Sequence, residues 1–318
     1  MGPRILMTDC PWGNSDVERE VLRPLEAEII EAPETDEATL AELARDVDAI
    51  ATCWAKVTEP VIDAATRCRI ICRMGIGLDN IDIPAATTRG IPVTNVPDYC
   101  VEEVADHALA LLLAFARNIG FFHLRSKQGE YNLPAGPPMR RLRGKTLGLF
   151  GLGRIGRRVA EKARGLGLDV IAHTASGSDH GTGCPMVSFD ELLARSDFVS
   201  IHAPLTSATR HIFDAAALAK MKSTAVLLNT SRGPLIDPEA LRGAIEAGRL
   251  GGAGLDVFEP EPPDLADPLY RNERVIVTPH AAFVSEESLL ELRTRVARQI
   301  LARLTGETPE NIVNGMPA

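Results

Sequence analysis

The sequence lacks the features that mark secreted, membrane-spanning or nucleic-acid-binding proteins. Its N-terminus enters a strand-like run directly, without the basic, apolar and cleavage regions of a signal peptide. The longest apolar run, 108–116, is far too short to cross a bilayer. Positive charge is also scarce, because 34 Lys and Arg stand against 43 Asp and Glu, a net charge of −9. An acidic surface disfavours nucleic acid and anionic membranes as partners.

Paired cysteines are missing as well. Six cysteines are scattered over 318 residues, and none forms a Cys-x-x-Cys pair. This pattern provides no paired zinc or redox motif, so we expect buried free thiols, no metal site and a reduced, cytoplasmic protein. The length indicates about two domains, and a hydrophobic content of 45% is enough for substantial cores.

One stretch, 145–156, organises the chain. An apolar strand pattern runs into Gly151, Gly153 and Gly156, which fit G-x-G-x-x-G, and a helix pattern follows. The first glycine allows the tight turn, the second lets backbone come close to a pyrophosphate, and the third lets the helix pack on the strand. The N–H groups at the start of the helix then face the phosphates. The stretch therefore predicts dinucleotide binding.

Strand-like and helix-like segments alternate on both sides of this stretch, which is typical of parallel βα units. The expected strands are 5–7, 27–30, 48–53, 69–74 and 91–95, then 147–150, 169–173, 197–202, 225–229, 252–257 and 274–279. Six strands from the glycine turn onward match the count of a Rossmann domain. One long helix is expected over 101–125, and a last helix, 288–304, is expected to return to the first domain.

Three polar residues come just after predicted strands of the second domain: Arg232, Glu261 and His280. A histidine can donate a proton to a carbonyl oxygen as hydride arrives. A carboxylate bonded to that histidine holds its tautomer and favours its protonated form. An arginine presents a planar fork to a substrate carboxylate. Each residue alone is more often structural or on the surface, but the set together with the glycine turn predicts redox chemistry at a carbonyl.

Six short motifs occur in order: MGIGLDNID at 74–82, GKTLGLFGLGRIG at 144–156, HAPLT at 202–206, LNTSRG at 228–233, LDVFEPEP at 255–262 and TPH at 278–280. In order and spacing they resemble those of D-isomer-specific 2-hydroxyacid dehydrogenases, over nearly the whole chain. Within that family, 98–106 and 278–287 are similar to the branch containing C-terminal binding protein, with phosphoglycerate dehydrogenases as kin. The resemblance implies an α/β protein of two domains. A flavodoxin-like substrate-binding domain would comprise 1–100 with 285–318, and a Rossmann nucleotide-binding domain with a six-stranded parallel sheet would comprise 101–284.

The resemblance also implies roles for individual residues. Arg232 would bind the 2-oxo acid, and His280 would be the acid/base. Glu261 would be the partner of that histidine, rather than the nearby Glu259, because the family pattern places the partner just before Pro262. The implied activity is hydride transfer between NAD or NADP and a 2-oxo acid/D-2-hydroxy acid pair, in a homodimer formed through the nucleotide-binding domain.

Further positions would line the cofactor and the substrate. The backbone of Ile76 and Gly77 would hold the substrate carboxylate, and Asp256 would contact the nicotinamide amide. The cofactor would be lined by Gly151, Gly153, Arg154, Ile155, Gly156, Thr174, Pro204 and Thr230. Trp54 and Tyr99 follow strands of the first domain and indicate an apolar or aromatic wall of the substrate pocket, although ordinary packing explains them equally well.

One position departs from the family pattern. NAD-using relatives usually carry Asp or Glu at the end of the second Rossmann strand to hold the ribose hydroxyls, but here Thr174 stands at about that place. Without the carboxylate a ribose 2′-phosphate is not repelled, and the hydroxyls of Thr174, Ser176 and Ser178 can donate to it. No Arg or Lys in the stretch 173–178 neutralises it. We therefore expect NADP to be tolerated, with NAD still possible.

Two other functions stay open at this point. A nucleotide-sensing scaffold or corepressor of the C-terminal binding protein type would keep the fold and act by binding proteins, but the complete set of Arg232, Glu261 and His280 argues against it. Phosphite oxidation on the same fold is not excluded, whereas formate enzymes of this type carry Gln in place of Glu261. The substrate pocket is equally open, because Arg73 and Lys56 are nearby cations if the substrate carries a second anion.

Overall fold

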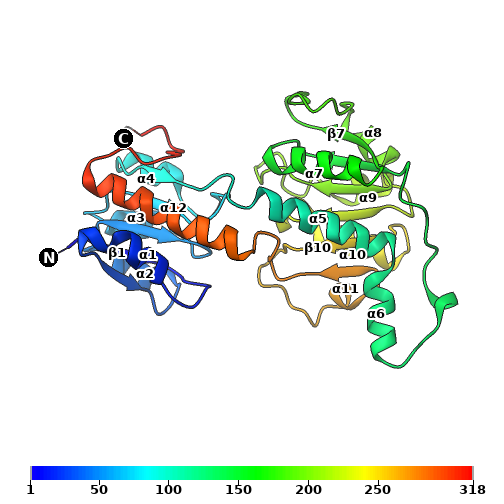
Figure 1. Ribbon diagram of the computed structural model, residues 1–318, viewed down its shortest axis with the longest axis horizontal. Helices are drawn as coiled ribbons and strands as arrows, with labels where there is room; N and C mark the ends of the chain where they lie inside the picture. Colours follow the sequence, from blue (N-terminus) through cyan, green and yellow to red (C-terminus); the bar gives the residue numbers. More distant parts are fainter. Residues whose placement is uncertain (1, 317–318) are drawn as a thin grey trace. The chain divides into compact units, whose positions relative to one another are not determined.

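The computed structural model describes residues 2–316, and the chain folds into two compact units (Figure 1). One unit runs up to Tyr99 and resumes at Ser285, and the other spans Cys100–Val284. Each unit is an α/β fold on a parallel sheet of its own, which confirms the predicted fold class. Within the described residues, no single helix is long and apolar enough to cross a membrane. Only α5 (Val101–Ala116) and α6 (Ile119–Lys127) together reach that length and composition, and a bend of 67° separates them.

The first unit is built on five parallel strands in the order β2-β1-β3-β4-β5, which is the flavodoxin-like order. The strands are β1 (Arg4–Met7), β2 (Glu28–Glu31), β3 (Ala49–Thr52), β4 (Ile71–Arg73) and β5 (Val93–Thr94). The helices are α1 (Asp16–Leu22), α2 (Glu37–Ala44), α3 (Glu59–Ala64), α4 (Ile83–Thr88) and α12 (Glu286–Thr305). The helices α1 and α12 pack together, as do α2 and α3. Leu6, Ile50 and Ile71, from three adjacent strands, are fully buried in the core.

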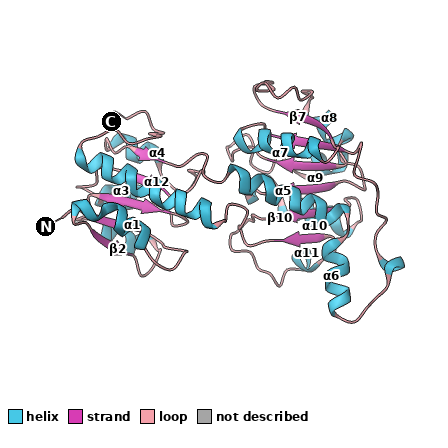
Figure 2. Cartoon of the chain, viewed as in Figure 1, coloured by secondary structure: helices cyan, strands magenta, loops and turns pink. Residues whose placement is uncertain are grey.

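The second unit is built on six parallel strands in the order β11-β10-β9-β8-β6-β7 (Figure 2). They are β6 (Thr146–Phe150), β7 (Asp169–His173), β8 (Phe198–Ile201), β9 (Val226–Asn229), β10 (Gly252–Leu255) and β11 (Val275–Val277). From β6 the chain moves to its neighbour β7 and then returns to β8 on the other side of β6. The glycine turn after β6 therefore stands at the topological switch point, where open α/β sheets bind ligands.

A rudimentary further strand lies beyond β7. Met186 forms an isolated parallel bridge with Ala172. Ala172 N donates to Pro185 O (3.0 Å), and Val187 N donates to Ala172 O (2.9 Å). With this bridge the sheet has the Rossmann order, in which a third segment lies outside the second strand. One bridge is too short to leave an alternating apolar pattern, so the sequence gives no sign of it.

Two apolar clusters pack on this sheet. Leu147 and Leu149 of β6 lie in a cluster with α5 and α7 (Arg154–Gly165), while Phe150 lies in the other cluster. This division follows from the period of a strand, whose successive side chains point to opposite faces. The second cluster is completed by α8 (Phe189–Arg195), α9 (Ala215–Lys220), α10 (Pro238–Glu246) and α11 (Pro268–Arg271).

The helix predicted over 101–125 is wrong as a single element, because α5 ends at Ala116 and α6 begins at Ile119. Asn118 adopts the left-handed conformation (φ 51°, ψ 35°), and its side-chain amide donates to Pro137 O (2.7 Å). Asn is one of the few residues other than glycine that tolerate this conformation. The buried apolar residues of α5 end at Leu112, and α6 has no buried residue, so the two helices differ in character as well as in direction.

Candidate active site

The polar residues expected to do chemistry lie in loops at one edge of the second sheet. All six strands are parallel, and β9, β10 and β11 are adjacent, so the loops after them emerge side by side at the carboxyl edge. Arg232 follows β9, Glu261 follows β10, and His280 follows β11. The glycine turn after β6 and the loop after β8 leave the same edge.

The three glycines of the turn differ in what surrounds them. Gly151 has φ +101°, and a Cβ added there would lie 2.6 Å from the carbonyl carbon of His202. A Cβ on Gly156 would collide with the carbonyl oxygen of Gly151, so this position permits the close approach of α7 to the turn. A Cβ on Gly153 would meet nothing within 4 Å. The open space is therefore at the N-cap of α7, where backbone N–H groups can receive a phosphate.

A second observation also fits a nucleotide cofactor. Thr230, in the loop after β9, is only 8% exposed, and its hydroxyl has no hydrogen-bond partner within residues 2–316. Buried hydroxyls are nearly always bonded, so this one is available to a ligand. Pro204 lies in the loop after β8. Although β7 lies between β6 and β8 in the sequence, β8 is the neighbour of β6 in the sheet, so this loop emerges next to the glycine turn. The residues present therefore fit a dinucleotide bound across the switch point.

His280 carries its side chain on a strained backbone. Its φ is 50°, in the left-handed region that non-glycine residues rarely adopt. Its Nδ1 lies 2.9 Å from Oε1 of Glu261, and its side chain is 18% exposed. The Glu261 carboxylate accepts a hydrogen bond from the protonated Nδ1 of His280. The other ring nitrogen, Nε2, is then the atom that gains or loses a proton. The ring of Phe283 packs edge-on against the imidazole, with 6.1 Å between centroids.

Glu259, the other carboxylate in the same loop, is engaged elsewhere. It accepts hydrogen bonds from Arg210 and from Nε2 of His211, the latter at 2.7 Å. Partial burial raises the pKa of Glu259, but the bonds from His211 and Arg210 outweigh it and hold that pKa below its ordinary value. The structure therefore pairs His280 with Glu261 and pairs Glu259 with a different histidine.

The loop that carries Arg232 is fixed by its neighbours. The side-chain amide of Asn229 donates to Arg232 O (2.8 Å), and Oδ1 of Asn229 accepts from Ser231 N (3.0 Å). Ser231 Oγ donates to Ala203 O (2.7 Å), which ties this loop to the loop after β8. The Arg232 guanidinium donates to Ser231 O (2.8 Å) and is half-buried.

Asp256 is fully buried, and its carboxylate already holds three donors. Thr278 Oγ1 donates to Oδ1 (2.5 Å), as does Ala281 N (2.9 Å), and Ala282 N donates to Oδ2 (2.9 Å). His107 on α5 reaches Thr278 Oγ1 with its Nε2 (3.0 Å). No role is predicted from the sequence for His107, or for Thr278 within the motif at 278–280. His107 stands three residues after Val104 on the apolar side of α5, and a polar residue at such a position is a signal that the sequence offers.

At the end of β7, Thr174 is half-buried and bonded locally. Its hydroxyl donates to Ser178 O (3.3 Å) and lies 3.4 Å from Ser176 Oγ. Asp179 accepts from Gly181 N and Gly183 N, and these backbone bonds lower its pKa. The loop after β7 is therefore rich in hydroxyls but also carries an ionised carboxylate.

The predicted substrate residues belong to the first unit. Ile76 and Gly77 follow β4, and the Ile76 carbonyl accepts from Asn95 Nδ2 (2.8 Å). Trp54 is 41% exposed, whereas Tyr99 is buried at 8%, so only the tryptophan presents an open aromatic face. Arg73, at the end of β4, is 7% exposed, and its Nε has no partner within the described residues.

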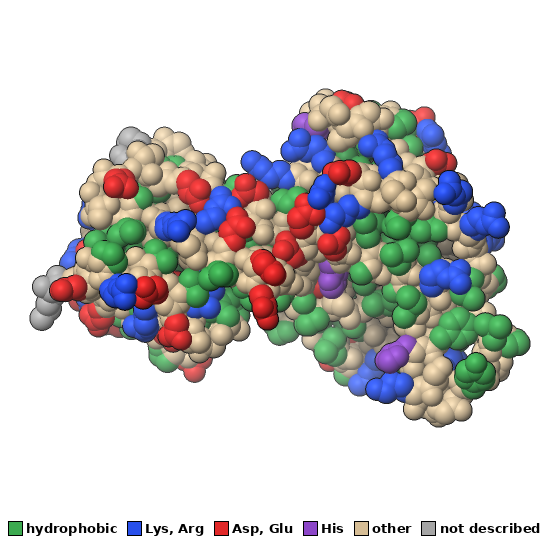
Figure 3. Space-filling view, viewed as in Figure 1, with side chains coloured by type: hydrophobic (Ala, Val, Ile, Leu, Met, Phe, Trp, Pro, Cys, Tyr) green, Lys and Arg blue, Asp and Glu red, His purple; other side chains and the backbone are tan. Residues whose placement is uncertain are grey.

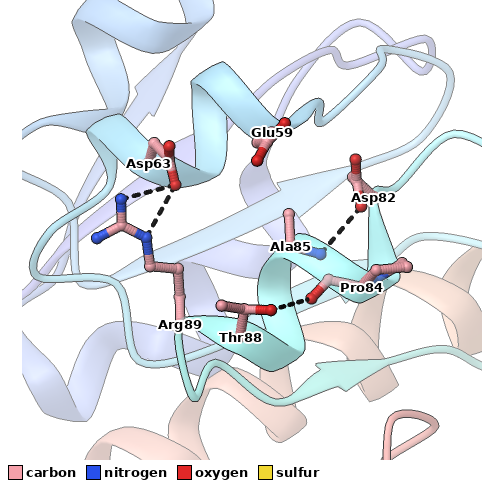
Figure 4. A pocket seen from close by; sticks show the side chains of 7 residues that line it. All are labelled: Glu59, Asp63, Asp82, Pro84, Ala85, Thr88 and Arg89. Carbon is pink, nitrogen blue, oxygen red and sulfur yellow. Dashed lines mark hydrogen bonds and ion pairs between the residues drawn. The ribbon is translucent and has the colours of Figure 1, made fainter.

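A hollow on the first unit has a different character (Figure 4). It lies between α3 and α4, where Arg89 pairs with Asp63 (2.7 Å) and Asp82 accepts from Ala85 N at the start of α4 (3.0 Å). The remaining lining residues are Glu59, Pro84, Ala85 and Thr88. These seven residues include three carboxylates but no histidine, and Asp63 is held by Arg89 and Asp82 by the start of α4. The hollow therefore does not repeat the His–Glu pair found at the edge of the second sheet.

Comparison with known proteins identifies the family. Residues 109–282 match the family model described as D-isomer specific 2-hydroxyacid dehydrogenase, NAD binding domain. A glyoxylate reductase of Korarchaeum cryptofilum is 40% identical over 294 residues, which cover 89% of this chain and 87% of that protein.

Two solved structures share the fold of this chain. D-lactate dehydrogenase of Aquifex aeolicus, complexed with NAD and lactic acid, has a TM-score of 0.88 at 29% identity, with 99% of this chain and 100% of that chain covered. An NADPH-dependent glyoxylate/hydroxypyruvate reductase of Sinorhizobium meliloti, in complex with NADP and malonate, has a TM-score of 0.89 at 32% identity and covers 99% and 98%. The chain therefore belongs to the D-isomer-specific 2-hydroxyacid dehydrogenase family and is an oxidoreductase that uses NAD or NADP on a small-molecule acid.

Proposed function

We propose that this protein reduces small 2-oxo acids of the glyoxylate and hydroxypyruvate type to 2-hydroxy acids. The observation that carries the proposal is the bond between His280 Nδ1 and Glu261 Oε1 (2.9 Å), at the sheet edge that also carries the glycine turn. Relatives named glyoxylate reductase and hydroxypyruvate reductase support this choice of substrate. The nucleotide, when bound, supplies the hydride to the carbonyl carbon.

In this proposal His280 supplies the proton. Nε2 donates to the carbonyl oxygen of the substrate while the carbonyl carbon receives hydride, so that the C=O bond becomes H–C–O–H. Glu261 holds the ring in orientation and stabilises the imidazolium form that donates. Arg232 binds the substrate carboxylate and polarises the neighbouring carbonyl. In the reverse direction His280 accepts the proton from the hydroxyl.

We assign substrate binding to the first unit and nucleotide binding to the second. Backbone of Ile76 and Gly77, with Trp54 and Tyr99 beside them on strand-end loops, is the proposed surface for the substrate. The proposed cofactor residues, all in loops at the carboxyl edge or at the start of α7, are Gly151, Gly153, Arg154, Ile155, Gly156, Thr174, Pro204, Thr230 and Asp256. The open N-cap at Gly153 and the unbonded hydroxyl of Thr230 support this assignment.

The two glutamates of one loop form a matched test of the acid/base assignment. Glu261→Gln removes the charge that faces His280, so we expect kcat to fall by about 10- to 100-fold, the value of one charge-assisted hydrogen bond. Glu259→Gln removes the partner of Arg210 and His211 and should leave kcat near that of the wild type. Steady-state kinetics with reduced cofactor and a 2-oxo acid measure both. Equal losses in the two variants would contradict the assignment.

Cofactor choice gives a second test. The relatives with solved complexes divide between NAD and NADP, and Thr174 stands where a carboxylate would exclude the 2′-phosphate. We expect Thr174→Asp to lower kcat/KM for NADPH relative to NADH by about 10- to 100-fold, because one hydrogen bond to a charged group is replaced by repulsion. Thr182→Asp, in the same loop but bonded to Asp179 O, is the control. An unchanged cofactor ratio in Thr174→Asp would place the ribose elsewhere.

We also propose a homodimer formed through the second unit. Apolar side chains lie exposed along α6 and the segment after it: Ile119, Leu124, Tyr131, Leu133 and Met139. Figure 3 shows apolar side chains gathered near α6 on the face drawn. Several exposed apolar side chains on one helix and the segment after it favour a protein–protein contact there. All six cysteines are free, which fits a reducing compartment, and we place the enzyme in the cytoplasm.

A further inference from the structure

A chain of hydrogen bonds runs from α5 to the loop that carries His280. It begins at His107, whose Nε2 lies 3.0 Å from Thr278 Oγ1. It continues with Thr278 Oγ1, which lies 2.5 Å from Asp256 Oδ1. Asp256 has an exposure of 0%, and the His107 side chain is 23% exposed. These three side chains come from α5, from the segment after β11 and from the end of β10.

The direction of each bond follows from counting protons. Asp256 accepts from two backbone N–H groups, so its carboxylate acts as an acceptor. The single hydroxyl proton of Thr278 must then point to Asp256, and the Thr278 oxygen is left to accept. His107 therefore donates from Nε2, which fixes its tautomer with the proton on Nε2. Within residues 2–316, His107 is also the only side chain that can pair ionically with Asp256, at 3.6 Å.

This network holds the backbone on both sides of His280. Thr278, two residues before it, is fixed by its hydroxyl, and its carbonyl accepts from His280 N (3.0 Å). Ala281 and Ala282, directly after it, are fixed through their N–H groups on Asp256. Between these anchors His280 adopts φ 50°, a conformation that persists only where the surroundings impose it.

We propose that His107 is a positioning residue for His280, acting through Thr278 and Asp256; this inference rests on the proposed role of His280. Removing the Nε2 donor leaves the Thr278 hydroxyl free to turn from Asp256 and deprives the buried carboxylate of its neighbouring imidazole. The loop then relaxes around His280. Displacement of a catalytic group by about 1 Å lowers a rate by about 100-fold. We therefore expect the larger effect on kcat and a smaller one on cofactor affinity, to which Asp256 is also proposed to contribute.

Four variants separate positioning from simple packing. His107→Leu removes the donor and keeps apolar bulk, and we expect kcat to fall by about 10- to 100-fold, with a smaller rise in the dissociation constant of NADH. His107→Gln keeps an amide N–H donor at similar reach and should restore most of the rate. His123→Gln, which keeps a polar side chain on exposed α6, is the control for His107→Gln and should change neither quantity. In the double variant His107→Leu/Thr278→Val, the two losses should not add, because both act through one path.

A readout independent of turnover completes the test. Amide hydrogen exchange of Ala281 and Ala282 should be faster in His107→Leu than in the wild type, with other segments unchanged, because both amides donate to Asp256. Wild-type exchange at these two amides would overturn the inference whatever the activity. A fully active His107→Leu, or equal losses in His107→Leu and His107→Gln, would also overturn it. Absence of turnover in the wild type counts instead against the proposed function.

Discussion

We expect His280→Asn to lower kcat for a 2-oxo acid by about 10²- to 10⁴-fold, the range for loss of a general acid. Asparagine is chosen because it tolerates the left-handed backbone at this position (φ 50°), whereas alanine would add strain. The amide N–H can donate a hydrogen bond but is not acidic enough to transfer its proton to a developing alkoxide. The dissociation constant of NADH, measured by fluorescence titration, should stay close to the wild-type value because the cofactor residues are untouched.

The chain contains a matched control for this variant. His211 also has a positive φ, 52°, and its Nε2 lies 2.7 Å from a glutamate, Glu259. His211→Asn therefore matches His280→Asn in three respects: the residue has a positive φ, histidine is replaced by asparagine, and a His–Glu hydrogen bond is lost. We expect it to keep nearly all of the activity. If His211→Asn lost most of its activity while His280→Asn stayed active, the acid/base would be His211 with Glu259, and our assignment would be wrong.

We expect Gly153→Phe to weaken cofactor binding strongly without unfolding the protein. The position is open, since an added Cβ would meet nothing within 4 Å, and its φ of −70° suits any residue. A phenyl ring there would occupy the space at the N-cap of α7 where the pyrophosphate is proposed to lie. Losing two charge-assisted hydrogen bonds weakens binding by at least about 100-fold. Fluorescence titration with NADH measures the loss.

Gly165→Ala, at the last residue of the same helix, provides the comparison. A Cβ there would also meet nothing within 4 Å, so this variant tests whether crowding of α7 as such matters. Both proteins should unfold near the wild-type temperature. Tight NADH binding by Gly153→Phe would mean that the cofactor does not approach the turn, and the account of the glycine motif would then be wrong.

Much of the second sheet follows from local pattern. The strands β6 and β7 show alternating or continuous apolar runs bounded by turn residues, which is why their positions are predictable. The break between α5 and α6 is not, because it depends on one asparagine in the left-handed conformation. The bridge at Met186 is also invisible, since its partner Ala172 lies in another strand and one residue makes no pattern.

In the candidate site, too, residues placed by local sequence pattern are predictable, whereas contacts between segments distant in the sequence are not. The position of Arg232 and His280 at the sheet edge is predictable from the sequence, because each follows a strand and parallel strands bring such positions to one edge. His107 lies 171 residues before the Thr278 hydroxyl that it contacts, so no local signal links the two. What the sequence does offer is a polar residue on the buried side of α5, between Val104 and Leu111.

The scaffold and phosphite alternatives make different demands on the same fold. A corepressor-type scaffold needs nucleotide binding but no proton donor at the sheet edge, whereas a dehydrogenase needs both. A phosphite enzyme transfers hydride from phosphorus and gives no D-hydroxy acid. The product of the reaction, rather than cofactor binding, therefore separates the three.

The most direct measurement is reduction of hydroxypyruvate by the purified protein with NADH and with NADPH, followed by chiral analysis of the product. The account predicts oxidation of at least one cofactor in step with formation of the D-enantiomer of glycerate, and turnover of glyoxylate under the same conditions. Cofactor binding without oxidation by any 2-oxo acid, or formation of the L-enantiomer, would contradict it.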